Sequence, residues 1–175
     1  MPESSLGRNP LVVCRIKVLC IAATAVLVDQ VTKWFVMQLM FLGQSVSVLG
    51  SFFKLTYIHN PGAVFGLTFG GKYLHLLLAG AALVVVGIML WRLPAGERYG
   101  SLGLALVFGG AIGNVVDRLR FGFVVDFLDF GFGDVRWWIF NVADACVTVG
   151  AALLIISYGR QEKEDGAESG SGGSG

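Results

Sequence analysis

Charged residues are scarce in this chain of 175 residues. Asp, Glu, Lys and Arg together make up 14% of it, whereas hydrophobic residues make up 55%. A water-soluble domain carries about 25% charged residues, so this composition excludes an ordinary soluble domain and predicts a membrane protein. The net charge is only +1 and the basic residues are scattered, which argues against a nucleic-acid partner.

Cysteine and histidine are also rare. Cys14, Cys20 and Cys146 lie in apolar runs without a C-x-x-C spacing, and His59 and His75 are far from them in the sequence. This pattern excludes a disulfide framework and gives no zinc-ligand motif. We therefore expect the cysteines to be small core or lipid-facing residues, and we expect neither a metal nor a cofactor.

Four apolar segments approach the roughly 20 residues that a helix needs to cross a membrane. They cover about residues 12–28, 73–93, 102–116 and 137–158, and the first can continue through "TKWFVMQLM". The connection at 40–72 contains "SVSVLGSFFKLTYIHN", which predicts two short strands with a turn near Gly50 and Ser51. The predicted fold class is an all-α membrane protein with four transmembrane helices and a small extracytoplasmic β-sheet between the first two.

The predicted four-span domain covers residues 1–160 and leaves a polar tail at 161–175. This tail is expected to be disordered, and its final "GSGGSG" is typical of an added flexible linker. Basic residues near the span ends favour a cytoplasmic location for both termini. Those on the cytoplasmic side are Arg8, Arg15, Lys17, Arg92, Arg98, Arg160 and Lys163. The opposite side carries Lys33, Lys54, Lys72, Arg118, Arg120 and Arg136, several with acidic neighbours that suggest ion pairs.

Several polar residues interrupt the apolar segments, where they need a partner or a function. Asp29 and Lys33 are four residues apart, in the order that favours a helical ion pair. Asn114, Asp117 and Arg118 have spacings that place them on one helix face. We expect an ion pair between Asp117 and Arg118 that ties down the following loop.

Asp126 is the polar residue that a structural role explains least. It lies between "FGFVV" and "FLDF", with no basic residue within five positions. Desolvation in such surroundings raises the pKa of a carboxyl group. Asn141 and Asp144 open the fourth segment, where they are expected to cap the helix. If Asp126 and Asp144 also meet, their repulsion separates the two titrations and leaves an acid and a base that can hydrolyse a peptide bond.

Five ordered motifs extend across almost the whole chain. They are "DQVTK" at 29–33, "NPGAVFG" at 60–66, "GGAIGNVVDR" at 109–118, "VVDF" at 124–127 and "FNVADA" at 140–145. This set resembles the lipoprotein signal peptidases, also called signal peptidase II. The resemblance implies a four-span aspartyl protease of the bacterial cytoplasmic membrane. Such an enzyme removes signal peptides from prolipoproteins by cutting before a cysteine that carries diacylglycerol.

The resemblance also assigns site residues by position. Asp126 and Asp144 become the catalytic pair, near the outer face of the membrane. The residues expected to bind the substrate are Asn60, Gly110, Asn114, Arg118 and Asn141. Asp29, Lys33 and Asp117 are expected to support the site. The expected partners are diacylglyceryl-modified prolipoproteins and membrane lipids, and the enzyme is expected to be a monomer.

Two other classes of membrane protein also place polar residues inside helices. A small transporter or proton channel would hold its acids near the middle of the bilayer and often shows internal repeats, which this sequence lacks. A purely structural subunit would explain the ion pairs but gives no reason for Asp126. The protease hypothesis accounts for both.

Overall fold

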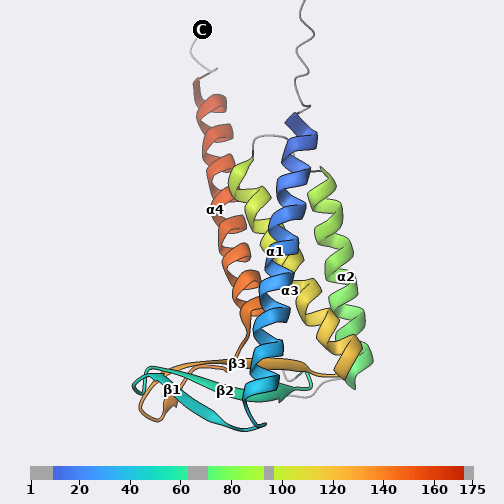
Figure 1. The fold of residues 1–175 in the computed structure, drawn as a ribbon. Coiled ribbons are helices and arrows are strands. Elements are labelled where there is room, and N and C mark those ends of the chain that lie inside the picture. The colour runs from blue at the N-terminus through green and yellow to red at the C-terminus, as the bar shows by residue number, and fades with distance from the viewer. Residues whose placement is uncertain (1–9, 63–70, 93–96, 172–175) are drawn as a thin grey trace, which may run out of the picture.

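The computed structural model describes residues 10–62, 71–92 and 97–171. Its helices are α1 (Pro10–Leu39), α2 (Gly71–Arg92), α3 (Arg98–Phe121) and α4 (Val142–Ser171). Its strands are β1 (Ser45–Leu49), β2 (Phe53–Asn60), β3 (Val124–Phe132) and β4 (Val135–Arg136). The helices form a bundle with the sheet at one end, and α1 begins and α4 ends at the other (Figure 1).

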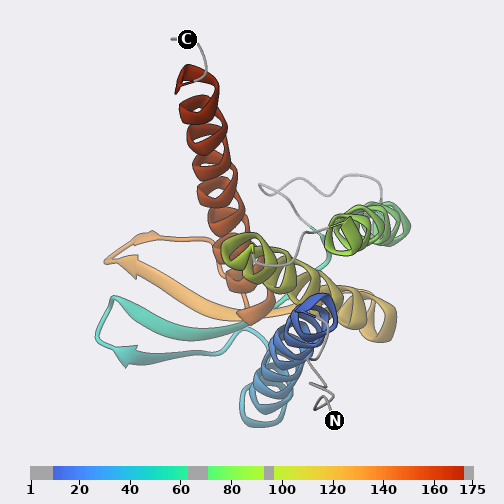
Figure 2. The same cartoon turned by 90° about the horizontal axis from the view of Figure 1, so that it is seen from above.

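Helix α3 lies in the middle of the bundle, with α1, α2 and α4 around it (Figure 2). Glycines allow this close approach. A Cβ atom on Gly103 would lie 2.8 Å from the carbonyl oxygen of Gly150 in α4. A Cβ on Gly109 would lie 2.7 Å from the carbonyl oxygen of Ala22 in α1. Small residues at such contacts are typical of packed membrane helices.

Three helices in the described part of the chain are long and apolar enough to cross a membrane. They are Tyr73–Arg92, Arg98–Phe121 and Val142–Arg160. Helix α1 has 30 residues but is not among these three. The chain therefore has the composition of a multi-pass membrane protein, while the fourth span stays a prediction.

The helix boundaries differ from the sequence predictions at several ends. Helix α3 is longer than the predicted 102–116, because Glu97 caps its start and Gly122, with φ of 81°, ends it. Helix α4 begins at Val142 rather than at 137, because the preceding residues still pair with β3: the Phe140 N–H donates to the Leu128 carbonyl at 3.1 Å. Helix α4 then continues to Ser171, into the tail expected to be disordered. The Glu, Lys, Gln and Ala residues in that stretch all favour a helix.

The sheet is antiparallel, with strand order β1-β2-β3-β4. The β1–β2 hairpin and its turn at Gly50 confirm the predicted pair of strands. The prediction that the sheet lies only between the first two helices was wrong, because β3 and β4 come from the connection between α3 and α4. The fold is therefore mostly helical rather than all-α. Strand β3 is buried at six of its nine positions without regular alternation, so it lacks the period-two pattern of a half-buried strand.

Two sets of contacts fix β3 between the helices and the rest of the sheet. Buried Val36 at the end of α1 belongs to one hydrophobic cluster with Tyr57, Val125 and Phe127 of the sheet. Farther along β3, the Asp129 carboxylate accepts hydrogen bonds from Arg136 Nη2 at 2.8 Å and Thr56 Oγ1 at 2.7 Å. The strand that carries Asp126 is thus held at the junction of bundle and sheet.

Candidate active site

A buried cation lies beside this junction. The Nζ atom of Lys33 is 2.9 Å from Asp29 Oδ2, 2.9 Å from Asp117 Oδ2 and 3.1 Å from Asn114 Oδ1. Lys33 is only 1% exposed, and both carboxylates are equally buried. The predicted Asp29–Lys33 pair is confirmed, and it forms part of a larger cluster that joins α1 to α3.

The carboxylates of this cluster extend it to α4 and β3. Asp29 Oδ1 accepts a hydrogen bond from the Ala143 N–H at 2.9 Å, in the first turn of α4. Asp117 Oδ2 accepts from the Val125 N–H at 3.0 Å, next to Asp126. Gln30, which the sequence analysis missed, donates to Asp117 Oδ1 at 2.9 Å. The polar cluster therefore sets the positions of the two segments that carry the candidate catalytic acids.

The predicted ion pair between Asp117 and Arg118 was wrong. The Asp117 carboxylate instead pairs with Lys33 and with the backbone of the next segment, so it does tie that segment down. Neighbouring helix residues point about 100° apart, which turns Arg118 away from this cluster. Arg118 is half-buried, and its Nε atom has no hydrogen-bond partner among the described residues. Among the acids, the charges of Asp144 and then Asp126 act most strongly on the Arg118 guanidinium group.

The start of α4 is capped reciprocally by Asn141 and Asp144. The Asp144 N–H donates to Asn141 Oδ1 at 2.9 Å, and the Asn141 N–H donates to Asp144 Oδ2 at 3.4 Å. This arrangement satisfies backbone donors that a helix start leaves free. It confirms the predicted cap and fixes the orientation of the Asp144 side chain.

Asp126 lies in β3 with 1% of its surface exposed. Both of its oxygens accept hydrogen bonds from amides. Asn141 Nδ2 donates to Oδ1 at 2.6 Å, and Asn60 Nδ2 donates to Oδ2 at 2.9 Å. Asn60 lies at the end of β2, where that strand pairs with β3, so the sheet register brings its side chain to the acid.

A chain of amide side chains connects the two acids. Asn141 Nδ2 also donates to Asn114 Oδ1 at 3.1 Å, and Asn114 Nδ2 donates to Asp144 Oδ1 at 2.7 Å. Asp144 is half-buried, so it is the more accessible of the two acids. The structure therefore brings Asp126, Asp144, Asn60, Asn114 and Asn141 together from four different elements.

Burial raises the pKa of the Asp126 carboxyl group to about 6. The negative charge of Asp144 raises this pKa further, while the hydrogen bonds from Asn60 and Asn141 and the positive charge of Lys33 oppose the rise. A carboxyl group with this pKa exchanges its proton close to neutral pH, which general acid–base chemistry requires.

Gly110 lies one helical turn before Asn114, at the contact of α3 with α4. A Cβ atom there would collide with the carbonyl oxygen of Ala143 and would lie 2.9 Å from Val147 Cγ2. This geometry is that of a helix-packing position. Among residues 10–62, 71–92 and 97–171, no three His, Cys, Asp or Glu side chains come together as a metal site would require.

Comparisons with known proteins identify the family of this chain. A family model described as signal peptidase (SPase) II matches residues 21–159. The chain is 46% identical over 138 residues to a lipoprotein signal peptidase of Symbiobacterium thermophilum, which covers 78% of this chain and 90% of that protein. The chain belongs to the signal peptidase II family. All five sequence motifs of the signal peptidase II resemblance fall within the matched region, although residues 63–66 of "NPGAVFG" lie outside the described residues.

Further relatives support this membership in the signal peptidase II family. A lipoprotein signal peptidase of Alteromonas mediterranea is 41% identical over 165 residues, covering 90% of each chain. Two solved structures described as a bacterial membrane enzyme are 30% and 31% identical, with TM-scores of 0.78 and 0.75. The first covers 85% of this chain and 90% of its own, and the second covers 81% and 92%.

Proposed function

We propose that this chain is an aspartic endopeptidase that removes signal peptides from diacylglyceryl-modified prolipoproteins, with Asp126 and Asp144 as its catalytic pair. The observation that carries the proposal is the shared amide network. It holds one buried and one half-buried carboxylate at the same end of the bundle. Membership in the signal peptidase II family supports the substrate class.

The environments of the two acids suggest a division of labour. Asp126, whose pKa burial raises, holds the proton of the pair, and half-buried Asp144 acts as the base. Asp144 takes a proton from a water molecule as the water oxygen attacks the peptide carbonyl carbon, and Asp126 gives its proton to the carbonyl oxygen. When the C–N bond of the tetrahedral intermediate breaks, Asp144 passes its proton to the leaving amine. Asp126 recovers its proton as the carbonyl re-forms.

The amides and Arg118 are suited to hold the substrate backbone. Arg118 is half-buried and lies within the electrostatic influence of Asp144 and Asp126, so its guanidinium group is placed to bind a substrate carbonyl oxygen beside the acids. Asn60, Asn114 and Asn141 orient the acids, and half-buried Asn60 is the most accessible of the three to a bound peptide. Such fixed donors align one peptide bond with the attacking water. Gly110 acts indirectly, through the α3–α4 contact.

The bundle would cross the inner membrane four times with both termini in the cytoplasm. At about 1.5 Å per residue, the 30 residues of α1 extend about 45 Å, enough to cross a hydrocarbon core about 30 Å thick. The end of the bundle away from the sheet is favoured as the cytoplasmic end by basic residues that are in no salt bridge among the described residues, namely Arg15, Lys17, Arg92, Arg98 and Arg160. At the sheet end, Lys33 and Arg136 are in salt bridges, which reduces their effect on orientation.

This orientation puts the sheet at the outer surface, next to the acids. Its rim exposes large apolar side chains, including Phe41, Phe132, Val135 and Trp137, which are 83%, 74%, 79% and 72% exposed. We infer that this rim rests on membrane lipids and holds the lipid-modified end of the substrate, and that the enzyme acts as a monomer. The acids cluster at this end rather than mid-bundle, which does not favour a transporter or a proton channel.

The test is cleavage of a prolipopeptide by the purified full chain in detergent. Two substrates of the same sequence are compared, one with diacylglycerol on the cysteine and one with an unmodified cysteine, and the products are identified by mass spectrometry. We expect a cut immediately before the cysteine in the modified substrate only, and the same rate in the presence of a chelator. Absence of cleavage, a cut elsewhere, or loss of activity with the chelator would contradict the proposal.

A further inference from the structure

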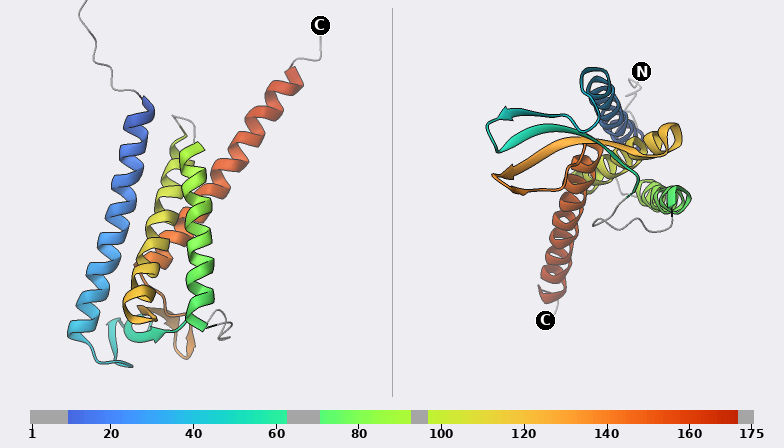
Figure 3. Two further views of the ribbon diagram at one scale, coloured as in Figure 1. Left: turned by 90° about the vertical axis from the view of Figure 1, so that its right-hand side faces the viewer. Right: turned by 90° about the horizontal axis from the view of Figure 1, so that it is seen from below.

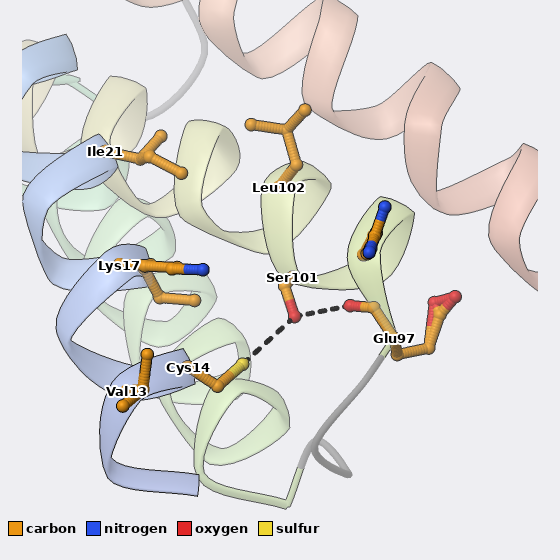
Figure 4. A pocket seen from close by; sticks show the side chains of 9 residues that line it. Val13, Cys14, Lys17, Ile21, Glu97, Ser101 and Leu102 are labelled. Atoms are coloured by element: carbon orange, nitrogen blue, oxygen red, sulfur yellow. Dashed lines mark hydrogen bonds between the residues drawn. The ribbon is translucent and has the colours of Figure 1, made fainter. Parts of the chain in front are cut away.

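A cavity of about 410 Å³ lies between α1 and the start of α3, at the end of the bundle away from the sheet (Figure 4). Its apolar wall includes Val13, Val18 and Ile21 of α1 and Leu102 of α3. Two basic side chains, Lys17 and Arg98, also line it. None of these residues belongs to the candidate active site, which lies at the other end of the bundle.

The remaining polar groups of the cavity are bonded to one another. The Ser101 hydroxyl lies 3.6 Å from the Cys14 sulfur and donates to the Glu97 backbone carbonyl, as the dashed lines in Figure 4 show. The Glu97 carboxylate accepts hydrogen bonds from the Gly100 N–H at 3.2 Å and from Ser157 Oγ at 2.9 Å. The only acid of the cavity is thus engaged in capping α3 and binding α4.

Lys17 and Arg98 differ from these bonded polar groups of the cavity, because both are exposed and neither is in a salt bridge within the described residues. The same end of the bundle carries two more arginines that lie over aromatic rings. Arg15 Cζ is 4.3 Å from the ring centre of Trp91, and Arg160 Cζ is 4.5 Å from that of Tyr99. Stacking on a ring leaves the positive charge in place. This end therefore presents an excess of positive charge around an apolar opening.

A second cavity, of about 360 Å³, continues along the same helix toward the sheet. It lies between α1 and α4, is lined by Val28, Val142 and Cys146 among others, and shares Ile21 with the first. From Val13 to Val28 a helix rises about 22 Å, which exceeds the roughly 15 Å of hydrocarbon in one membrane leaflet. The two cavities together form a groove long enough for a lipid acyl chain.

The groove is separate from the side on which the substrate would meet the acids. Val142 and Cys146 line the groove, and Asp144 is two positions from each along α4. Two positions correspond to a rotation of about 200° around a helix, so the Asp144 side chain points away from the groove. The views in Figure 3 show that α4 diverges from the other helices toward its C-terminal end.

We propose that this groove binds an anionic phospholipid of the leaflet at that end of the bundle. Lys17 and Arg98 hold the phosphate of the head group, and an acyl chain lies along α1 over Val18 and Ile21. Basic side chains next to an apolar surface are the features that attract anionic lipids. The apolar wall gives a free phosphate ion no further donors, so the lipid is the favoured ligand. The proposal does not depend on the protease function.

The test is native mass spectrometry of the full chain in detergent, titrated with dioleoyl phosphatidylglycerol or with dioleoyl phosphatidylcholine. The test variant is Lys17→Gln with Arg98→Gln. The matched control is Arg92→Gln with Arg160→Gln, which removes the same charge at the same end but outside the cavity lining. A third titration uses inorganic phosphate alone. Cleavage of the prolipopeptide is measured for both variants, because neither changes the candidate active site.

We expect one phosphatidylglycerol to bind the unsubstituted protein and the control, with phosphatidylcholine binding much more weakly. Each lost cation typically weakens binding to an anionic lipid about fivefold, so the test variant should bind about 25-fold more weakly. Cleavage in detergent should be unchanged in both variants. Equal phosphatidylglycerol binding by the two variants, equal retention of phosphatidylcholine, or binding of inorganic phosphate as strong as that of the lipid would each overturn the proposal.

Discussion

Replacement of Lys33 by methionine tests whether the buried cluster holds the site together. Methionine has a similar length but no charge, so Asp29 and Asp117 would both remain buried without their cation. Breaking a buried ion pair from one side typically costs about 3–5 kcal/mol, and here one substitution breaks two pairs. In a chain of this size each kcal/mol lowers the melting temperature by about 2–4 °C, so we expect a decrease of at least about 6 °C.

The assay is thermal unfolding of the purified protein in lipid-free detergent at pH 7. Lys17→Met is the matched control, because Lys17 lies on the same helix but is exposed. Adding Asp29→Asn to Lys33→Met should recover part of the loss, since it removes one of the two unpaired carboxylates. A melting temperature within about 2 °C of the control would refute the idea that this cluster joins α1, α3, α4 and β3.

Three further predictions concern neighbouring residues. Asp29→Ala should lower the melting temperature more than it lowers the cleavage rate per folded molecule, because it removes the acceptor for the Ala143 N–H. A variant with an unchanged melting temperature and no cleavage activity would contradict this. Gly110→Ala should cost about 1–3 kcal/mol in unfolding measurements, because the added Cβ meets the Ala143 carbonyl, and no loss would contradict the close contact. Burial raises the folded-state pKa of Asp126 from the ordinary value of 3.8 to about 6, so ionisation of this group costs stability as pH rises from about 4 to about 6. Relative to Asp126→Asn, the unsubstituted protein should therefore lose about 3 kcal/mol of unfolding free energy over that range and no more above it. A stability difference between the two proteins that does not change with pH would contradict this prediction.

The apolar segments and the local polar spacings predicted much of this structure. The helices follow from the hydrophobic runs, the Asp29–Lys33 pair from its i, i+4 spacing, and the Asn141 cap from its place before an apolar helix. Each of these features depends on residues that are close in the sequence. Asp126 stood out because no neighbour in the sequence explained a carboxylate there.

The features that were missed depend on residues far apart in the sequence. Asp117 pairs with Lys33, 84 positions away in the sequence. No local spacing indicates this ion pair rather than one with the neighbouring residue Arg118. Strand β3 is buried on both faces, so its sequence does not alternate as a half-buried strand does. The contribution of Gln30 appears only when α1 and α3 are placed side by side.

The central claim is that Asp126 and Asp144 act together as the catalytic pair. The most direct measurement is the cleavage rate of the diacylglyceryl-modified prolipopeptide by Asp126→Asn, Asp144→Asn and the double variant. The control is Asp134→Asn, because Asp134 is an exposed aspartate in the turn between β3 and β4. Each single variant should lose at least about a thousandfold in rate while remaining folded and binding the substrate, and the double variant should be hardly slower, because residues that work as a unit are not additive. The control should cleave at the normal rate. Near-normal cleavage by either Asp126→Asn or Asp144→Asn would contradict the account.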